Sequence, residues 1–177
     1  EHFRDGLRRY MKRHKGGNAT GADLWDALGE ATQEPVDRLM RSWIMQPGFP
    51  LVTVMAGEHQ SQTLLHFKQQ RFFAGASHID PSRDQHWHIP MVLRFDAGNG
   101  AQVHRVAMTE QEQVMTLPVA ATARWIYPNA DASGFYRVRL DDTLLTALLH
   151  DGLASLNAAE RASLLSDEWA LVRAGLE

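Results

Sequence analysis

The spacing of apolar residues divides the chain into a helical, an extended and a second helical region. In the first region Phe3, Leu7 and Met11 recur at the spacing of one helix face, and Gly16-Gly17 ends that helix. Two further helices are predicted before residue 48, the second of them opening at Pro35. The chain therefore starts with three predicted helices.

Local signals mark where two of the predicted helices begin. Thr20, with Asp23 three residues later, matches a capping box, in which each residue satisfies a backbone N–H near the other. Near the C-terminus, Asn157 and Glu160 form a similar pair ahead of an apolar pattern at 158–174. These pairs predict the first turns of two helices.

Between the helices the apolar pattern changes to alternation, which is typical of strands. The clearest signal places apolar residues at every second position: Trp87, Ile89, Met91, Leu93 and Phe95. A strand at 51–55 is expected to end in a turn at Gly57. Seven short strands fit the whole region, and they argue for a β-sandwich. The predicted fold is mixed and mainly β, a seven-strand β-sandwich flanked by N-terminal and C-terminal helices.

Composition restricts the possible partners and chemistry. The 177 residues include 18 Lys and Arg against 21 Asp and Glu, so a net charge near −3 gives no electrostatic reason to bind nucleic acid. The chain has no cysteine, which excludes disulfides, thiolate zinc sites and cysteine nucleophiles. It lacks an apolar stretch of about 18 residues, so no membrane partner is expected. Its first residues show no initiator Met and no signal-peptide pattern, as expected of a chain that starts within a longer protein.

Motifs for common catalytic sites are missing. None of the nine His is followed by Glu, so the zinc motif H-E-x-x-H is absent. The G-x-S-x-G elbow, the Walker phosphate loop and the G-x-G-x-x-G fingerprint are absent as well. No catalytic, cofactor-binding or metal-binding residue is therefore assigned in this chain.

One metal hypothesis remains open, at His86 and His88. Two His at this spacing share one face of a strand, but a metal site needs three or four ligands. His66 and His104 would join only if the fold brought them close. The simpler interpretation is a strand whose polar residues face water.

Other polar and aromatic residues are interpreted as structural. The cluster of His78 with Asp80 and Asp84 is assigned to a surface loop. Ser61, His59 and Glu58 are adjacent, but adjacency is not the geometry of a catalytic triad. Each Trp lies on an apolar stripe of its own element, which favours core packing over a carbohydrate platform: Trp25, Trp43, Trp87, Trp125 and Trp169. We expect Arg71 to pair across the sheet or with a helix, because a buried charge needs a partner.

A series of short motifs follows the order of a known family. The motifs are F-x-x-G-L-x-x-Y at 3–10, N-A-x-x-x-D-L-W at 18–25, M-x-x-W-x-x-Q-x-G-F-P at 40–50, Q-x-R-F at 69–72, W-x-I-P at 87–90, W-x-x-x-N at 125–129, G-F-Y-R-V at 134–138 and L-x-x-x-x-R-x-x-L-x-x-D at 156–167. With these motifs, which run nearly end to end, the chain resembles zinc aminopeptidases of the aminopeptidase N type. It departs at Leu140, where the family often has Tyr, which affects local packing alone.

The resemblance implies a non-catalytic segment. In this family the G-x-M-E-N loop, the H-E-x-x-H zinc ligands with a downstream Glu, and the catalytic Tyr all precede the helix at 3–10. Tyr10 belongs to that later helix and is not the catalytic Tyr. The resemblance thus implies zinc in the full-length parent and none in this chain. It also implies three parts: the last helices of the catalytic domain (1–47), the β-sandwich domain (48–140) and the first helices of the C-terminal helical domain (141–177).

The resulting hypothesis is an inter-domain spacer. Its full-length parent removes N-terminal residues from peptides with zinc-activated water, and the chain alone does no chemistry. Its partners are the remaining domains of the parent. Without them, two apolar stripes are expected to pack within the chain, stay loosely ordered or self-associate: Phe3, Leu7 and Met11, and Leu164, Trp169 and Val172.

Two rival functions stay open. A free-standing β-sandwich module for peptide or sugar would be favoured by an exposed row of aromatic side chains on one sheet. A metal-dependent hydrolase using His86 and His88 requires a third ligand and an open coordination position.

Overall fold

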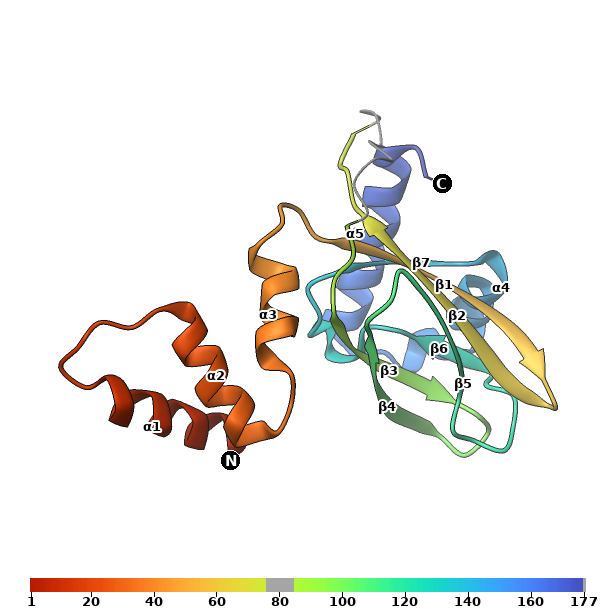
Figure 1. Ribbon diagram of the computed structural model, residues 1–177. Helices are drawn as coiled ribbons and strands as arrows, with labels where there is room; N and C mark the ends of the chain where they lie inside the picture. The colour runs from red at the N-terminus through yellow and green to blue at the C-terminus, as the bar shows by residue number, and fades with distance from the viewer. Residues whose placement is uncertain (76–84, 177) are drawn as a thin grey trace. The chain divides into compact units, whose positions relative to one another are not determined.

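The structure, a computed structural model, describes residues 1–75 and 85–176 (Figure 1). The chain forms two compact units, Glu1–Pro47 and Gly48–Glu177. Each unit has buried apolar residues of its own, for example Trp25 in the first and Phe67 in the second.

The N-terminal unit consists of three helices, α1 (His2–His14), α2 (Gly21–Thr32) and α3 (Val36–Ile44). The predicted capping box of α2 is confirmed, since Asp23 N donates to Thr20 Oγ1 and Thr20 N donates to Asp23 Oδ2. Helices α1 and α2 approach closely at Gly6. A Cβ there would lie 2.7 Å from Leu28 Cδ2, so the contact requires glycine.

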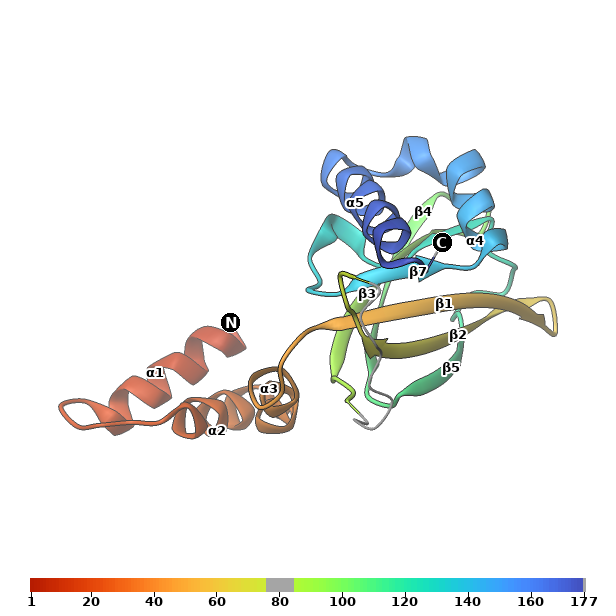
Figure 2. The same ribbon diagram turned by 90° about the horizontal axis from the view of Figure 1, so that it is seen from above.

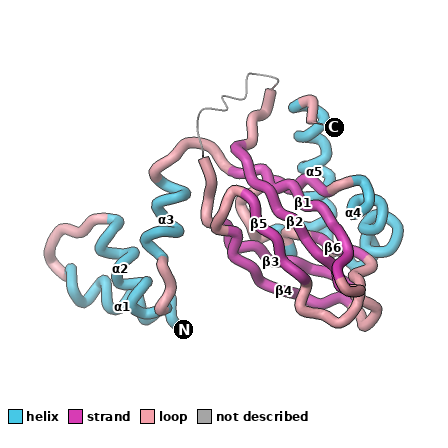
Figure 3. The backbone as a smooth tube through the Cα atoms, turned by 45° about the vertical axis from the view of Figure 1, so that its right-hand side comes forward, coloured by secondary structure: helices cyan, strands magenta, loops and turns pink. Residues whose placement is uncertain are grey.

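The described residues of the C-terminal unit form seven strands in two sheets (Figure 3). The first sheet has the order β5-β2-β1-β7 and the second the order β4-β3-β6. The bounds are β1 (Pro50–His59), β2 (Gln62–Arg71), β3 (Ile89–Asp96), β4 (Ala101–Met108), β5 (Glu112–Thr116), β6 (Trp125–Tyr127) and β7 (Arg137–Leu140). All pairs are antiparallel except β1 with β7, which is parallel.

Two helices complete this unit, α4 (Asp142–Ala147) and α5 (Ala158–Ala174), joined by a π-helical turn at Leu148–Gly152 and a short 3-10 turn. In Figure 2 the strands β7, β1, β2 and β5 follow one another away from α4 and α5. A further 3-10 turn, Ala130–Ala132, lies between β6 and β7. No helix in the described part of the chain is long and apolar enough to cross a membrane.

The core takes its side chains from both sheets. Alternate residues of β1 and β2 are fully buried, and so are alternate residues of β3: Val52, Val54, Leu65, Phe67, Met91, Leu93 and Phe95. The alternation read from 87–95 therefore marks a buried face, as predicted. Across the described residues, helical positions outnumber strand positions. The fold is mixed α and β, and the expectation that the chain is mainly β is not confirmed.

Two predicted strand limits are corrected by pairing. Strand β1 does not end at Gly57 but runs to His59, because Gly57 pairs with Leu64 and the ladder continues to the next two residues. The turn lies at Gln60 and Ser61, both with positive φ (51° and 61°), a conformation that suits a two-residue hairpin.

The other correction concerns the start of β3, which begins at Ile89 rather than Trp87. The main chain of Trp87 bonds to a side chain instead of a strand, since Trp87 N donates to Gln69 Oε1 (2.7 Å) and Gln69 Nε2 donates to Trp87 O (2.9 Å). Gln69 is fully buried, and this pair of bonds satisfies its amide group.

Candidate functional site

The metal hypothesis finds no support among the described residues. The rings of His86 and His88 lie on one side of the chain with centroids 6.3 Å apart. In residues 1–75 and 85–176, no group of three or more His, Asp or Glu side chains could hold a metal ion. Among these described residues, His86 and His88 therefore lack the third ligand that a zinc site needs.

The other two candidate His lie on different sheets. His66, in β2, faces Glu112 with 3.6 Å between His66 Nε2 and Glu112 Oε2. His104 lies in β4 of the second sheet. Neither comes together with His86 and His88 in a metal-binding group.

The remaining polar clusters of the sequence differ in what can be said of them. Glu58, His59 and Ser61 lie at the β1–β2 hairpin, where all three are exposed. The cluster of His78, Asp80 and Asp84 lies outside the described residues.

Arg71, at the end of β2, contacts an aromatic ring. Its guanidinium carbon lies 4.8 Å from the centroid of the Phe73 ring, a cation–π contact. Its Nε is buried without a hydrogen-bond partner among the described residues. The pairing expected across the sheet or with a helix stays a prediction.

Hydrogen bonds and a buried ion pair join helix α5 to the second sheet. Glu160, whose side chain is fully buried, accepts from Arg94 Nε of β3 (2.7 Å) and from Asp131 N (2.8 Å) through one oxygen. Its other oxygen accepts from Asn157 N (2.8 Å), which closes the predicted capping box. One carboxylate therefore caps α5 and fixes it to β3.

A second buried carboxylate joins α5 to the first sheet. Asp167 accepts from Arg137 Nη1 (2.8 Å) and from Val138 N (3.1 Å), both in the edge strand β7. Asp167 lies seven residues after Glu160, about two helical turns, so both carboxylates occupy the same face of α5. Leu164 and Leu171 complete this buried face. Helix α5 is thus held to both sheets at once.

Burial leaves Asp167 with an unusual proton affinity. Removal from water raises the pKa of Asp167 to about 6, although the Val138 N–H and the Arg137 guanidinium oppose that rise. The Asp167 carboxyl of the folded chain is therefore half-protonated near pH 6.

The motif residues between β6 and β7 have a structural role. Gly134 N donates to Asn129 Oδ1 (2.8 Å), and Tyr136 Oη donates to Pro128 O (2.7 Å). A Cβ on Gly134 would collide with the Tyr136 ring. These residues close a tight loop that positions β7 for its contact with Asp167.

The contacts of Glu160 with Arg94 and of Asp167 with Arg137 were not predicted from the sequence. Glu160 was assigned to a cap and Asp167 was given no role, because their partners lie 66 and 30 residues away. The available signal was the spacing of Glu160, Leu164, Asp167 and Leu171, which form one helical stripe. A stripe that mixes carboxylates with Leu indicates buried ion pairs rather than a solvated face.

Comparisons with known proteins agree with the motifs. The model of the peptidase family M1 domain matches residues 1–43, and that of the ERAP1-like C-terminal domain matches 125–177. The chain is 34% identical over 175 residues to "Puromycin-sensitive aminopeptidase" of Caenorhabditis elegans, covering 98% of this chain and 18% of that protein.

Relatives from a plant and from human match the same share of this chain. "Aminopeptidase M1" of Arabidopsis thaliana is 31% identical over 98% of this chain and 20% of its own length. Human "Endoplasmic reticulum aminopeptidase 1" is 27% identical over 98% and 21% respectively. The chain spans about a fifth of each of these relatives. The family models and these relatives support a segment of an M1 family zinc aminopeptidase, as the resemblance predicted.

The substitution Glu160→Gln should destabilise the C-terminal unit. It leaves the Arg94 guanidinium, 21% exposed, without its buried counter-charge, at a cost of about 3 kcal/mol. The matched control is Glu112→Gln, which breaks an exposed pair of equal length with Lys68 (2.7 Å) and should cost less than about 1 kcal/mol. Urea unfolding of the three proteins measures both effects. Equal losses would show that the Glu160 contacts contribute no more than a surface pair.

The pH dependence of stability should carry the signature of Asp167. Because the pKa of Asp167 is raised in the folded chain, folding takes up a proton there between pH 6 and 4. Relative to Asp167→Asn, the unfolding free energy of the unsubstituted chain should therefore increase as pH falls from 7 to 5. Urea titrations of both proteins at several pH values test the sign. A relative decrease would mean that the pairing with Arg137 outweighs burial.

Proposed function

We propose that this chain is a non-catalytic spacer within a zinc aminopeptidase whose full-length form removes N-terminal residues from peptides. The observation that carries the proposal is the attachment of α5 to both sheets through Glu160 and Asp167. Two buried carboxylates on one helix face fix its direction relative to the strands. A spacer needs this property to hold the helices that follow it in one orientation.

The spacer proposal divides the chain into three parts. Residues 1–47 are assigned to the end of the catalytic domain, 48–140 to a β-sandwich and 141–177 to the first helices of a C-terminal helical domain. Support comes from the two family models, which match the two ends of the chain and leave 44–124 between them. The buried inner residues of both sheets, such as Phe67 and Leu93, support a sandwich.

The proposed partners are the remaining domains of the parent, which would cover the outer face of α5. On that face Leu165, Trp169 and Val172 are 72%, 64% and 55% exposed. Their spacing of four and three residues is that of a helix-packing stripe, which α5 keeps apart from its buried carboxylate face. Leu164, by contrast, packs within the chain, whereas Phe3 and Met11 of α1 are exposed.

The rival binding module has less support. Trp125 of β6 and Trp87, which precedes β3, are both buried, so they form no exposed aromatic row. Trp169 does border a pocket with Phe72 and Arg137, but its volume is about 180 Å³. Pockets for small organic ligands usually measure at least about 300 Å³.

Zinc content distinguishes the spacer from a metal hydrolase. After dialysis of the purified chain against a weak chelator, we expect near-zero zinc by atomic absorption. We also expect no release of fluorophore from leucyl aminomethylcoumarin. Close to one zinc per chain would overturn the proposal. Loss of that zinc in the double variant His86→Ala with His88→Ala would then assign the metal to those residues.

Exposure of the α5 stripe should produce self-association in the chain by itself. Contiguous exposed apolar residues promote association, so the sedimentation coefficient should rise with concentration. Leu165→Glu should abolish that rise, whereas Ala159→Glu, an exposed position of the same helix outside the stripe, should leave it unchanged. A monomer at all concentrations would count against a helix-packing role for this face.

A further inference from the structure

The four edges of the two sheets differ in how they are protected. Strand β7 is covered by α5, since Val138 N donates to Asp167. Strand β6 has three residues, all buried. Strand β5 has five residues and carries Glu112, which pairs with Lys68. Short length, charge and cover are the usual means by which sheet edges avoid pairing with another chain.

Strand β4 is longer than β5, β6 and β7, and over Val103 and Arg105 no described element covers its outer edge. Its eight residues pair with β3 without a break in register, so no bulge distorts it. It contains neither Pro nor Lys. At the margin of its sheet (Figure 3), it pairs with no second strand among the described residues.

Two hydrogen bonds establish which β4 residues turn their main chain to the open side. Asp96 O accepts from Arg124 N on the β6 side of β3, so the odd-numbered residues of β3 face β4. Their partners in β4 are even-numbered, for example Met91 with Val106. Independently, Ala107 O accepts from Gln113 Nε2 of β5 and not from β3. The N–H and C=O groups of Val103 and Arg105 therefore point to the open edge.

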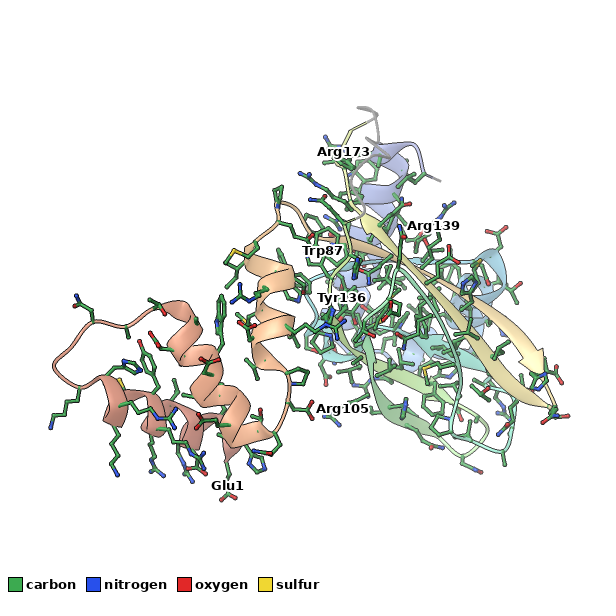
Figure 4. The ribbon with its side chains drawn as sticks, in the orientation of Figure 1. Glu1, Trp87, Arg105, Tyr136, Arg139 and Arg173 are labelled. Carbon is green, nitrogen blue, oxygen red and sulfur yellow. The ribbon has the colours of Figure 1, made fainter. Side chains whose placement is uncertain are left out.

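The side chains at this edge define what could pair with it. Val103 is 47% exposed, and the neighbouring Ala101 and Ala107 are exposed as well. Arg105 projects outward from β4 (Figure 4) and forms no ion pair with the described residues. Beside it lies a hollow of about 320 Å³ lined by Pro90, Met91, Val92, Arg105, Val106 and Ala107. The edge is thus apolar with one cation at its centre.

We propose that the open edge of β4 binds an extended peptide segment as an added antiparallel strand, with an acidic side chain opposite Arg105 and apolar side chains opposite Val103 and Ala107. Main-chain bonds to Val103 and Arg105 supply affinity, and the side-chain pairs supply selectivity. A second copy of β4 fits less well, because β4 contains no Asp or Glu that could lie opposite Arg105. The inference does not rest on the spacer function.

The binding test uses the 177-residue chain and a labelled heptapeptide, acetyl-Val-Thr-Glu-Thr-Val-Thr-Val-amide, followed by fluorescence polarisation. Aligned antiparallel, its Glu lies opposite Arg105. We expect saturable binding that weakens about tenfold when Lys replaces Glu, because a charge-assisted bond is lost. Arg105→Glu should reverse this preference. Equal binding of both peptides by both proteins would overturn the proposal.

Main-chain recognition is tested by N-methylation of the peptide. Methylating the Glu nitrogen, which faces β4 in this alignment, should abolish binding, whereas methylating the following Thr nitrogen should not. On the protein side, Val103→Pro removes an outward N–H that β3 does not use and should abolish binding, whereas Val103→Thr should retain it. Urea midpoints show whether the Pro variant is folded.

Amide exchange gives a readout that does not depend on any variant. Exchange at Val103 and Arg105 should be fast in the chain alone and slow once the peptide is added. Unchanged exchange at both residues would overturn the proposal. A dimer that forms without peptide and is lost in Val103→Pro would also overturn it, in favour of pairing between two copies.

Discussion

The buried carboxylate of Glu160 is the contact on which the arrangement of the C-terminal unit most depends. Its two oxygens serve a helix cap, a strand and a 3-10 turn, so three elements are located by one group. Such a group cannot be left half-satisfied, because an unpaired charge in the interior costs several kcal/mol. Because the buried carboxylate must be paired, the position of α5 relative to its partners is also specific. Apolar packing alone would let α5 slide or rotate over the strands, whereas the bonds to Arg94 and Asn157 permit a single position.

The second carboxylate adds a different constraint, because Asp167 bonds to the main chain of an edge strand. Val138 N would otherwise face outward from β7, as the N–H groups of Val103 and Arg105 do in β4. In this unit, therefore, one sheet edge is closed by a helix side chain and another is left open. The range of one family model also combines strands of the sheets with α5. The ERAP1-like C-terminal domain model begins at residue 125, so it includes β6 and β7 of the sheets together with α5. The division of the chain by sequence families and its division by packing do not coincide.

Local signals in the sequence were sufficient for those elements whose cause is local. The Thr20–Asp23 and Asn157–Glu160 pairs predict helix starts because the bonds they make lie within one turn. The alternation at 87–95 predicts a strand because one face is buried. The errors have distant causes. Gly57 was predicted to form a turn, but it pairs with Leu64 and β1 continues past it. Strand β3 begins two residues later than predicted, because the main chain of Trp87 bonds to the side chain of Gln69. The family itself was recognised from the order of its motifs, which no local energetic argument supplies.

The parallel pairing of β1 with β7 has a consequence for the way the chain folds. Leu51 pairs with Arg137 across more than eighty residues of intervening sequence, so this ladder closes a very long loop. Contacts of such separation slow folding, because the entropy of loop closure is lost before the contacts form. During synthesis, one edge of β1 stays unpaired until β7 has left the ribosome. The hairpin of β1 and β2 is complete long before that, and is suited to serve as the template on which the later strand arrives.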